Sequence, residues 1–288
     1  MKNLFAEISG YAASRKDMVD LALKEHLPSA KKYPALLHHA IRYSVFPGGK
    51  RFRAVLVMAS YETFRKTPAK ILPVACAVEL IHTYSLIHDD LPALDNDDTR
   101  RGRPSLHRKF NEALAVLAGD ALLTMAFSLL SDRSKTSFSP AKVLAVINEI
   151  ASACGASGMV GGQTVDICRG AGFTLKELEY IHSRKTAALI RSSAMSGALL
   201  GGARNSELEK ISSYGNYLGL AFQMMDDLKD AGGNKNEPNF AVLIGRTDAE
   251  QKTAGYIKKA KNALEGFGKK GDLLKGIADE LYKGFGAE

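Results

Sequence analysis

The sequence predicts an all-α protein, folded as a single helical bundle. Eight of the nine prolines lie in the first half of the chain, and none occurs between Ala141 and Glu237. Long stretches without proline that are rich in alanine and leucine favour helix. Apolar residues recur at helical spacing, and no run shows the strict alternation of a half-buried strand. We therefore expect ten or more helices.

The first clear helix is predicted to begin at Pro73. Proline suits the first turn of a helix, and apolar residues follow at intervals of three and four up to Leu86. The most apolar long run comes next, at residues 113–130, and Asp120 interrupts it. This run predicts a buried helix of a soluble protein rather than a membrane span. The N-terminus lacks a continuous apolar stretch of signal-peptide length, so we expect a cytoplasmic protein without membrane insertion.

Two further helices are predicted in the second half. Residues 175–200 follow Thr174, and Glu177 stands three positions after that threonine, which is the pattern of a capping box. Residues 211–228 show the same helical periodicity. The last thirty or so residues are rich in lysine and glycine, and we expect one or two peripheral helices there.

Composition excludes several classes of protein. An apolar fraction of 45% is too high for a disordered chain. The three cysteines are Cys76, Cys154 and Cys168, an odd number without a C-x-x-C pair. A disulfide framework and a cysteine-built zinc site are therefore not expected, and a reducing compartment fits best. The net charge of +8 is compatible with nucleic acid, an anionic surface or small anionic substrates.

Two clusters of aspartates each follow an apolar helical segment. The first comprises Asp89, Asp90 and Asp95, and the second comprises Asp226, Asp227 and Asp230. Asp226 and Asp230 are one helical turn apart on the same face, where like charges repel unless a cation bridges them. Pro92 lies between Asp89 and Asp95, and a local bulge there would bring Asp95 beside Asp89. Oxygen ligands without histidine or cysteine select a hard cation such as Mg²⁺, Mn²⁺ or Ca²⁺.

Basic residues accompany these acidic clusters. A Gly48-Gly49 turn precedes a basic segment that runs to Arg53, and such a turn exposes backbone N–H groups to a phosphate. Arg100 and Arg101 follow the first aspartate cluster, and Arg forks suit bidentate contacts to phosphate. A nucleic-acid face would be a basic stripe without carboxylates, because carboxylates repel phosphates. The mixture instead indicates a small phosphorylated ligand held through metal ions.

At this point the chain resembles the short-chain trans-isoprenyl diphosphate synthases, in particular the bacterial farnesyl diphosphate synthase type. The matching motifs occur in the family's order over nearly the whole chain: Gly48 to Arg53, Ile87 to Asp95 with Arg100 to Gly102, Gly161 to Gln163 with Asp166, Lys185 with Thr186, and Phe222 with Gln223 and Asp226 to Asp230. The resemblance implies an all-helical isoprenoid synthase type I fold around a deep central cavity, and a homodimer. Because these motifs serve one cavity, we expect one domain spanning residues 1–288.

The resemblance also implies a role for each motif. The metal ligands would be Asp89, Asp90, Asp95, Asp226, Asp227 and Asp230, holding three Mg²⁺ ions per active site, with Mn²⁺ as an alternative. The allylic diphosphate would contact Arg100, Lys185, Thr186 and Gln223, and isopentenyl diphosphate would contact Gly49, Lys50, Arg53, His82 and Arg101. The catalytic residues would be Asp89, Asp90, Asp95, Asp226 and Asp227, together with Arg100, Lys185 and Thr186. Small isoprenoid diphosphates are therefore the expected partners, and nucleic acid is not.

The product is expected to be farnesyl diphosphate. Tyr84 lies five residues before Asp89, about 7.5 Å along a helix axis, where a bulky ring with Ser85 beside it would limit the length of the product. Two alternatives stay open: a geranylgeranyl diphosphate synthase and a non-catalytic prenyl diphosphate-binding subunit. A terpene cyclase shares the aspartate-rich chemistry but would not need the basic residues for a second diphosphate. The chain departs from the family after Asp230, where the loop is short and Lys235 would have to replace a family lysine.

Overall fold

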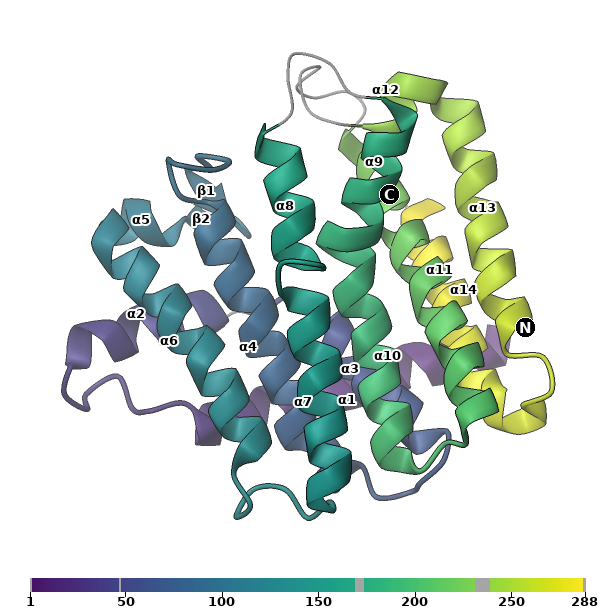
Figure 1. Ribbon diagram of the computed structural model, residues 1–288, viewed down its shortest axis with the longest axis horizontal. Helices are drawn as coiled ribbons and strands as arrows, with labels where there is room; N and C mark the ends of the chain where they lie inside the picture. The colour runs from purple at the N-terminus through teal and green to yellow at the C-terminus, as the bar shows by residue number, and fades with distance from the viewer. Residues whose placement is uncertain (1, 47, 169–173, 231–238, 287–288) are drawn as a thin grey trace. The chain divides into compact units, whose positions relative to one another are not determined.

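The computed structural model describes residues 2–46, 48–168, 174–230 and 239–286, and these are almost entirely helical (Figure 1). Within them, strand is confined to the two-residue pair β1 (Thr99–Arg100) and β2 (Arg103–Pro104). The prediction of an all-α fold is therefore confirmed. The chain divides into two compact units, and α1 (Lys2–His26) and α3 (Phe52–Glu62) each contribute to both.

The first unit comprises residues 13–55 and 69–139. Its other helices are α2 (Ala35–Val45), α4 (Leu72–Asp89), α5 (Leu106–Lys109) and α6 (Glu112–Ser131), with the 3₁₀ turn η1 (Pro68–Ile71) leading toward α4. Helices α4 and α6 lie side by side and form its largest helix–helix contact (Figure 1). Gly119 permits this approach, because a β-carbon there would overlap the imidazole of His88.

The second unit comprises residues 1–12, 56–68 and 140–288. Its described helices are α7 (Pro140–Cys154), α8 (Met159–Cys168), α9 (Leu175–Ile181), the π-helix η2 (His182–Ala187), α10 (Ala188–Gly201), α11 (Asn205–Asp230), α12 (Phe240–Ile244), α13 (Arg246–Ala263), η3 (Gly268–Gly271) and α14 (Asp272–Gly286). Helix α11 packs against α10, α13 and η2. It therefore occupies the centre of this unit.

The predicted helices are present, with one difference in the second unit. Pro73 lies in the first turn of α4, and Thr174 and Glu177 form both hydrogen bonds of a capping box. The predicted helix 175–200, however, is divided into α9, η2 and α10 by one π-helical segment. A π segment widens the helix locally and is often found at functional sites.

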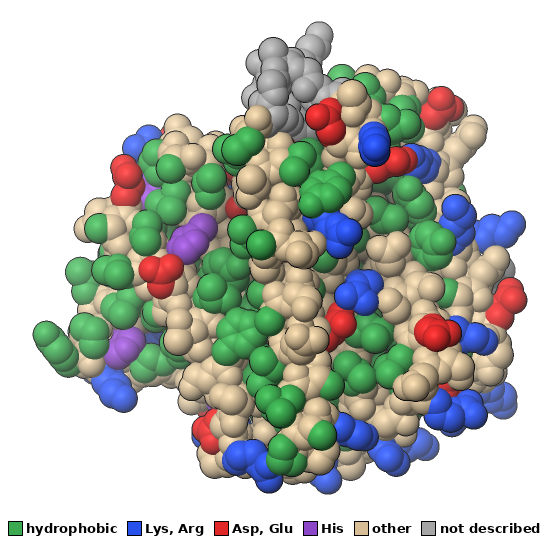
Figure 2. Space-filling view, viewed as in Figure 1, with side chains coloured by type: hydrophobic (Ala, Val, Ile, Leu, Met, Phe, Trp, Pro, Cys, Tyr) green, Lys and Arg blue, Asp and Glu red, His purple; other side chains and the backbone are tan. Residues whose placement is uncertain are grey.

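Within the part of the chain that the structure describes, three helices are long and apolar enough to cross a membrane by length and composition, namely Pro68–Asp89, Glu112–Ser131 and Pro140–Cys168. In the most apolar 18-residue stretch of each helix, 72% is buried in Pro68–Asp89 but only 44% in Glu112–Ser131. The expectation of a buried helix at residues 113–130 is thus met on one face only. The other face of α6 exposes Val116 and Leu117, and Figure 2 shows apolar side chains gathered there.

Candidate active site

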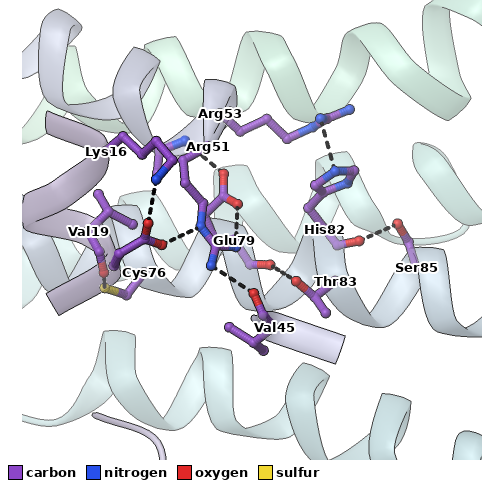
Figure 3. Close-up of polar contacts among 12 residues, drawn as sticks. Lys16, Val19, Val45, Arg51, Arg53, Cys76, Glu79, His82, Thr83 and Ser85 are labelled. Atoms are coloured by element: carbon purple, nitrogen blue, oxygen red, sulfur yellow. Dashed lines mark hydrogen bonds and ion pairs between the residues drawn. The ribbon is translucent and has the colours of Figure 1, made fainter. Parts of the chain in front are cut away.

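In the first unit, the basic segment after Gly48 alternates between outward and inward side chains. Lys50 is exposed, Arg51 is buried and Arg53 is half-buried. The Arg53 Nη1 atom lies 3.4 Å from Nε2 of His82 on α4 (Figure 3). Gly49 adopts a positive φ of 61°, and a β-carbon on it would lie 3.3 Å from Nε of Arg101. The turn therefore brings together the residues that the sequence predicted for the isopentenyl diphosphate site.

His82 is neutral in this surrounding. Burial and the neighbouring guanidinium groups, Arg53 first among them, hold the pKa of His82 well below its usual range. A neutral imidazole can either donate or accept a hydrogen bond, depending on its tautomer. His82 can therefore contact a phosphate oxygen as a donor, but it does not contribute a positive charge.

The first aspartate cluster is shaped by the end of α4. After this helix ends, the backbone N–H of Asp95 donates to the carbonyl oxygen of Asp89 over 2.9 Å. This turn closes around Pro92 and returns the chain to the helix end. The predicted bulge that brings Asp95 beside Asp89 is therefore present in the backbone.

Asp90 is the buried member of this cluster, and its carboxylate is bound by Arg100. Arg100 donates to Oδ1 of Asp90 through Nε at 2.9 Å and through Nη2, and Nη2 also donates to Asp97 at 2.6 Å. Burial raises the pKa of Asp90, although the hydrogen bonds from Arg100 oppose that shift. Asp90 thus orients Arg100, a residue predicted to contact the allylic diphosphate.

Arg101 stands at the tip of the β1–β2 hairpin. Both Arg101 and Gly102 have positive φ angles, 54° and 71°, as required in a two-residue type I′ turn. A glycine tolerates this conformation, whereas an arginine in it is strained by about 1–3 kcal/mol. This hairpin was not predicted from the sequence, although an Arg-Gly pair between short polar segments is compatible with one.

In the second unit, α11 carries the other aspartate cluster with Asp226 half-buried and Asp230 exposed. Asp227 is buried, and its carboxylate accepts from the backbone N–H of Phe240 at 2.8 Å and from Gln223 at 3.2 Å. Nε2 of His182 lies 3.3 Å from the same carboxylate. Burial raises the pKa of Asp227 to about 6. Both oxygens of Asp227 are therefore engaged within the protein.

The π-helix η2 presents Lys185 and Thr186. The Lys185 Nζ atom lies 2.8 Å from Asp166 on α8, and the Thr186 hydroxyl donates to Oε1 of Gln223 over 2.6 Å. Gly162 on α8 makes this approach possible, because a β-carbon there would overlap the backbone of Lys185. The second unit thus gathers the predicted allylic contacts Lys185, Thr186 and Gln223 around one end of α11.

Tyr84 is buried in α4, 6% exposed, with its ring centroid 5.8 Å from that of His88. The hydroxyl of Ser85 donates to the carbonyl oxygen of His82 over 2.9 Å. Tyr84 thus lies in the apolar interior one turn and a half before Asp89. Its position fits both a core aromatic and the floor of a product pocket.

The donor set fits a hard cation that the substrate helps to hold. Among the described residues, no three acidic, histidine or cysteine side chains already converge as a metal cage. Mg²⁺ is usually held by one or two carboxylates together with substrate phosphates, so a complete protein cage is not required. Asp89, Asp90 and Asp95 in the first unit, and Asp226, Asp227 and Asp230 in the second, are the carboxylates predicted for this role. Lys235 lies outside the described residues.

Several supporting residues were not predicted. Asp20 and Glu79 both bind Arg51 in the first unit, and His182 contacts Asp227 in the second. The position of Glu79 could have predicted such a contact, because a carboxylate within the otherwise apolar run before His82 requires a buried partner. The position of His182 could not, because a single histidine on a helix is compatible with an ordinary core position.

Comparison with known proteins agrees with this arrangement. The chain is 40% identical over 271 residues to the farnesyl diphosphate synthase of Geobacillus stearothermophilus, covering 89% of this chain and 91% of that protein. It is 40% identical over 287 residues to the chloroplastic geranylgeranyl pyrophosphate synthase of Capsicum annuum, covering 94% and 77%. The crystal structure of a geranyltransferase from Legionella pneumophila matches with a TM-score of 0.90 and 31% identity, covering 98% and 99%.

A family model described as polyprenyl synthetase matches residues 34–242. This range contains the Gly48–Arg53 turn, both aspartate clusters and the π-helix. Because the match covers most of the chain, and because the similarity to prenyltransferases extends nearly from end to end, this chain belongs to the polyprenyl synthetase family.

Proposed function

We propose that this protein condenses isopentenyl diphosphate with dimethylallyl and then geranyl diphosphate to give farnesyl diphosphate. The observation that carries this proposal is the presence of two aspartate clusters, with Arg100 bound to Asp90 of the first, in a chain 40% identical to a farnesyl diphosphate synthase. The substrates are small isoprenoid diphosphates, and nucleic acid is not a partner.

The chain's own residues have distinct tasks in the proposed reaction. Arg100, Lys185, Thr186 and Gln223 bind the allylic diphosphate, and Gly49, Lys50, Arg53, His82 and Arg101 bind isopentenyl diphosphate. Asp89, Asp90, Asp95 and Asp226 would hold Mg²⁺, three ions per site, with Asp230 and Asp227 nearby. When bound, Mg²⁺ supplies positive charge that stabilises the leaving diphosphate.

The chemistry follows from this distribution of charge. The allylic C–O bond breaks and its electron pair leaves with the diphosphate, to which Arg100 and Lys185 donate hydrogen bonds. The double bond of isopentenyl diphosphate then supplies the electrons for the new C–C bond. A proton leaves the adjacent carbon for the released diphosphate, which restores a double bond. No protein nucleophile is required, and His82, being neutral, is not the source of the positive charge.

The direct test is incubation of the purified protein with isopentenyl and dimethylallyl diphosphates and Mg²⁺, followed by product analysis. We expect farnesyl diphosphate, and we expect Asp89→Ala to abolish its formation while leaving the circular dichroism spectrum unchanged. Absence of condensation with every allylic primer would refute the enzymatic proposal. Retained activity in Asp89→Ala would refute the metal assignment alone.

A geranylgeranyl product is the second candidate, and the similarity to the Capsicum annuum enzyme over 94% of this chain favours it. The same assay distinguishes the two products by chain length. We further propose that the protein acts in the cytoplasm as a homodimer, with each chain forming one domain over residues 1–288.

A further inference from the structure

Arg51 lies in the middle of the basic segment but faces the protein interior. It is 2% exposed, whereas Lys50 on one side is exposed and Arg53 on the other is half-buried. In Figure 3 the Arg51 side chain lies beside Glu79 and Val45, while Arg53 extends toward His82. The two arginines of this segment therefore serve different purposes.

Three elements of the first unit hold the Arg51 guanidinium. Its Nε donates to Oδ1 of Asp20 on α1 over 2.8 Å, and its Nη2 donates to the carbonyl oxygen of Val45, the last residue of α2, over 2.8 Å. Its Nη1 lies 3.4 Å from Oε2 of Glu79 on α4. A guanidinium can satisfy three separate acceptors because its donors are fixed in a planar fork.

The same group fixes the backbone of the basic turn. Arg51 adopts a positive φ of 50°, which costs a side-chain-bearing residue about 1–2 kcal/mol. Gly48 packs directly on the guanidinium, since a β-carbon there would overlap it. Glu79 also accepts from the backbone N–H of Ala54 in α3 over 3.1 Å. Contacts on both sides of Arg51 thus hold the turn in a conformation it would not otherwise favour.

The positive charge of Arg51 is compensated inside the protein. Two carboxylates, Asp20 and Glu79, lie against it. Burial opposes ionisation of Asp20, but the hydrogen bonds from Lys16 and Arg51 lower its pKa. An internally neutralised guanidinium has little attraction left for a substrate, whereas Lys50 and Arg53 are the accessible cations of the segment.

We propose that Arg51 is a positioning residue for isopentenyl diphosphate binding, with Asp20 and Glu79 as its anchors. It holds the Gly48–Arg53 turn so that Lys50 and Arg53 are presented at the fixed separation that a diphosphate requires. The proposal rests on the proposed function, in which these two residues bind isopentenyl diphosphate.

The test compares Arg51→Lys and Glu79→Gln with the control Lys16→Met. Lysine keeps the positive charge but cannot reach three acceptors, and glutamine removes one anchor while keeping the shape. Lys16 also binds Asp20, at 2.8 Å, but its side chain is 38% exposed and does not touch the turn. We expect Arg51→Lys to raise the KM for isopentenyl diphosphate at least about tenfold, with the KM for geranyl diphosphate changed less than about twofold. Lys16→Met should change neither constant.

Isopentenyl diphosphate binding is measured in parallel by calorimetry on each variant that retains a cooperative melting transition. Glu79→Gln keeps the proposal testable if Arg51→Lys does not fold, and it should also weaken isopentenyl diphosphate binding selectively. A fall in Tm with unchanged affinity in the folded variants would overturn the positioning role and leave a purely structural one. Wild-type protein that binds isopentenyl diphosphate but forms no product would refute the proposed function alone. Wild-type protein that does not bind it would refute both.

Discussion

At the scale of single residues, the most unusual pair is His182 and Asp227, which lie 3.3 Å apart with both side chains buried. Burial lowers the pKa of His182 to about 3 and raises the pKa of Asp227 to about 6. The backbone N–H of Phe240 donates to the carboxylate of Asp227. The side-chain amide of Asn239 donates to the backbone carbonyl oxygen of Asp227 over 2.7 Å. Asp227 therefore joins α11 to the start of α12 and to η2.

The two pKa shifts predict opposite effects of pH on stability. Between pH 4 and 6 the folded protein retains a proton on Asp227 that the unfolded chain has lost, so this residue makes unfolding more favourable as the pH rises. Over the same range the unfolded chain protonates His182 and the folded protein does not, so this residue makes unfolding more favourable as the pH falls. The two contributions nearly cancel in the wild-type protein.

Removing either partner should expose the effect of the other. For Asp227→Asn we expect the free energy of unfolding to decrease by about 3 kcal/mol, relative to wild type, as the pH falls from 6 to 4. His182→Phe keeps a ring against Phe240. For this variant we expect the free energy of unfolding to increase, relative to wild type, as the pH falls from 6 to 4. Chemical denaturation of metal-free protein at several pH values measures both. If the free energy of unfolding of both variants depended on pH as that of the wild type does, the assigned directions of the two pKa shifts would be wrong.

Tyr84 gives a second prediction at this scale. If its ring limits the product pocket, Tyr84→Ala should lengthen the product beyond farnesyl diphosphate, as resolved by chromatography of the dephosphorylated products. Truncating a buried aromatic costs about 3–5 kcal/mol of stability in either case. Tyr61→Ala is the matched control, because Tyr61 is 2% exposed in α3, and its product should stay unchanged. An unchanged product in Tyr84→Ala would leave Tyr84 as a core residue.

The site residues that could be predicted from the sequence are those whose role follows from residue type and spacing alone. The clustering of Asp226, Asp227 and Asp230 is evident along the chain, but the difference between them is not. Asp227 alone is buried, because α12 and η2 pack over that side of α11. Similarly, Lys50, Arg51 and Arg53 have the same charge in the sequence, and only the structure separates the buried one from the others.

At the scale of elements, the bulge after α4 was predictable and the π-helix was not. Proline disrupts regular helix when it lies in the helix interior, so the end of α4 before Pro92 follows from a local rule. The π-helix instead depends on neighbours distant in sequence. Gly162 on α8 and Gly219 on α11 both lack a side chain where they meet η2, and β-carbons there would overlap its backbone or Ala187. The helical periodicity of residues 175–200 does not depend on these contacts, so it could not predict the π-helix.

Gly162→Ala should therefore displace η2. Overpacking of this kind costs about 1–3 kcal/mol of stability. Because Lys185 and Thr186 lie on η2, we also expect kcat to fall by about tenfold or more. Gly255→Ala is the control, since a β-carbon at Gly255 on α13 meets nothing within 4 Å and should leave kcat unchanged. Urea denaturation and steady-state kinetics measure the two effects. A destabilised Gly162→Ala with wild-type kcat would show that η2 tolerates the shift.

At the scale of the whole molecule, the net charge of +8 is not by itself a signal for a substrate. Several of the cations at the proposed sites have acidic partners, as Arg100 has Asp90 and Lys185 has Asp166. Much of the excess instead lies on surface lysines such as Lys258 and Lys270. The net charge therefore does not by itself identify a partner.

The exposed apolar side chains concern the whole molecule as well. On α6, Val116 is 41% and Leu117 is 57% exposed, and in the second unit Leu144 is 65% and Val160 is 48% exposed. Contiguous apolar surface on a soluble protein commonly marks an interface. Association of two chains through such surfaces would cover them and would explain why helices of membrane-like composition occur in this family member.

We therefore expect sedimentation equilibrium to give twice the chain mass of 31.1 kDa. Leu117→Glu should shift the protein toward monomer, because a carboxylate buried in an apolar interface without a partner is costly. Leu36→Glu on α2 is the matched control, since Leu36 is 58% exposed in the same unit, and it should leave the mass unchanged. If these faces bound lipid instead, the wild-type protein would be monomeric and would sediment with phospholipid vesicles. A wild-type protein that is monomeric and does not sediment with vesicles would exclude both chain association and lipid binding as explanations of the exposed apolar face on α6.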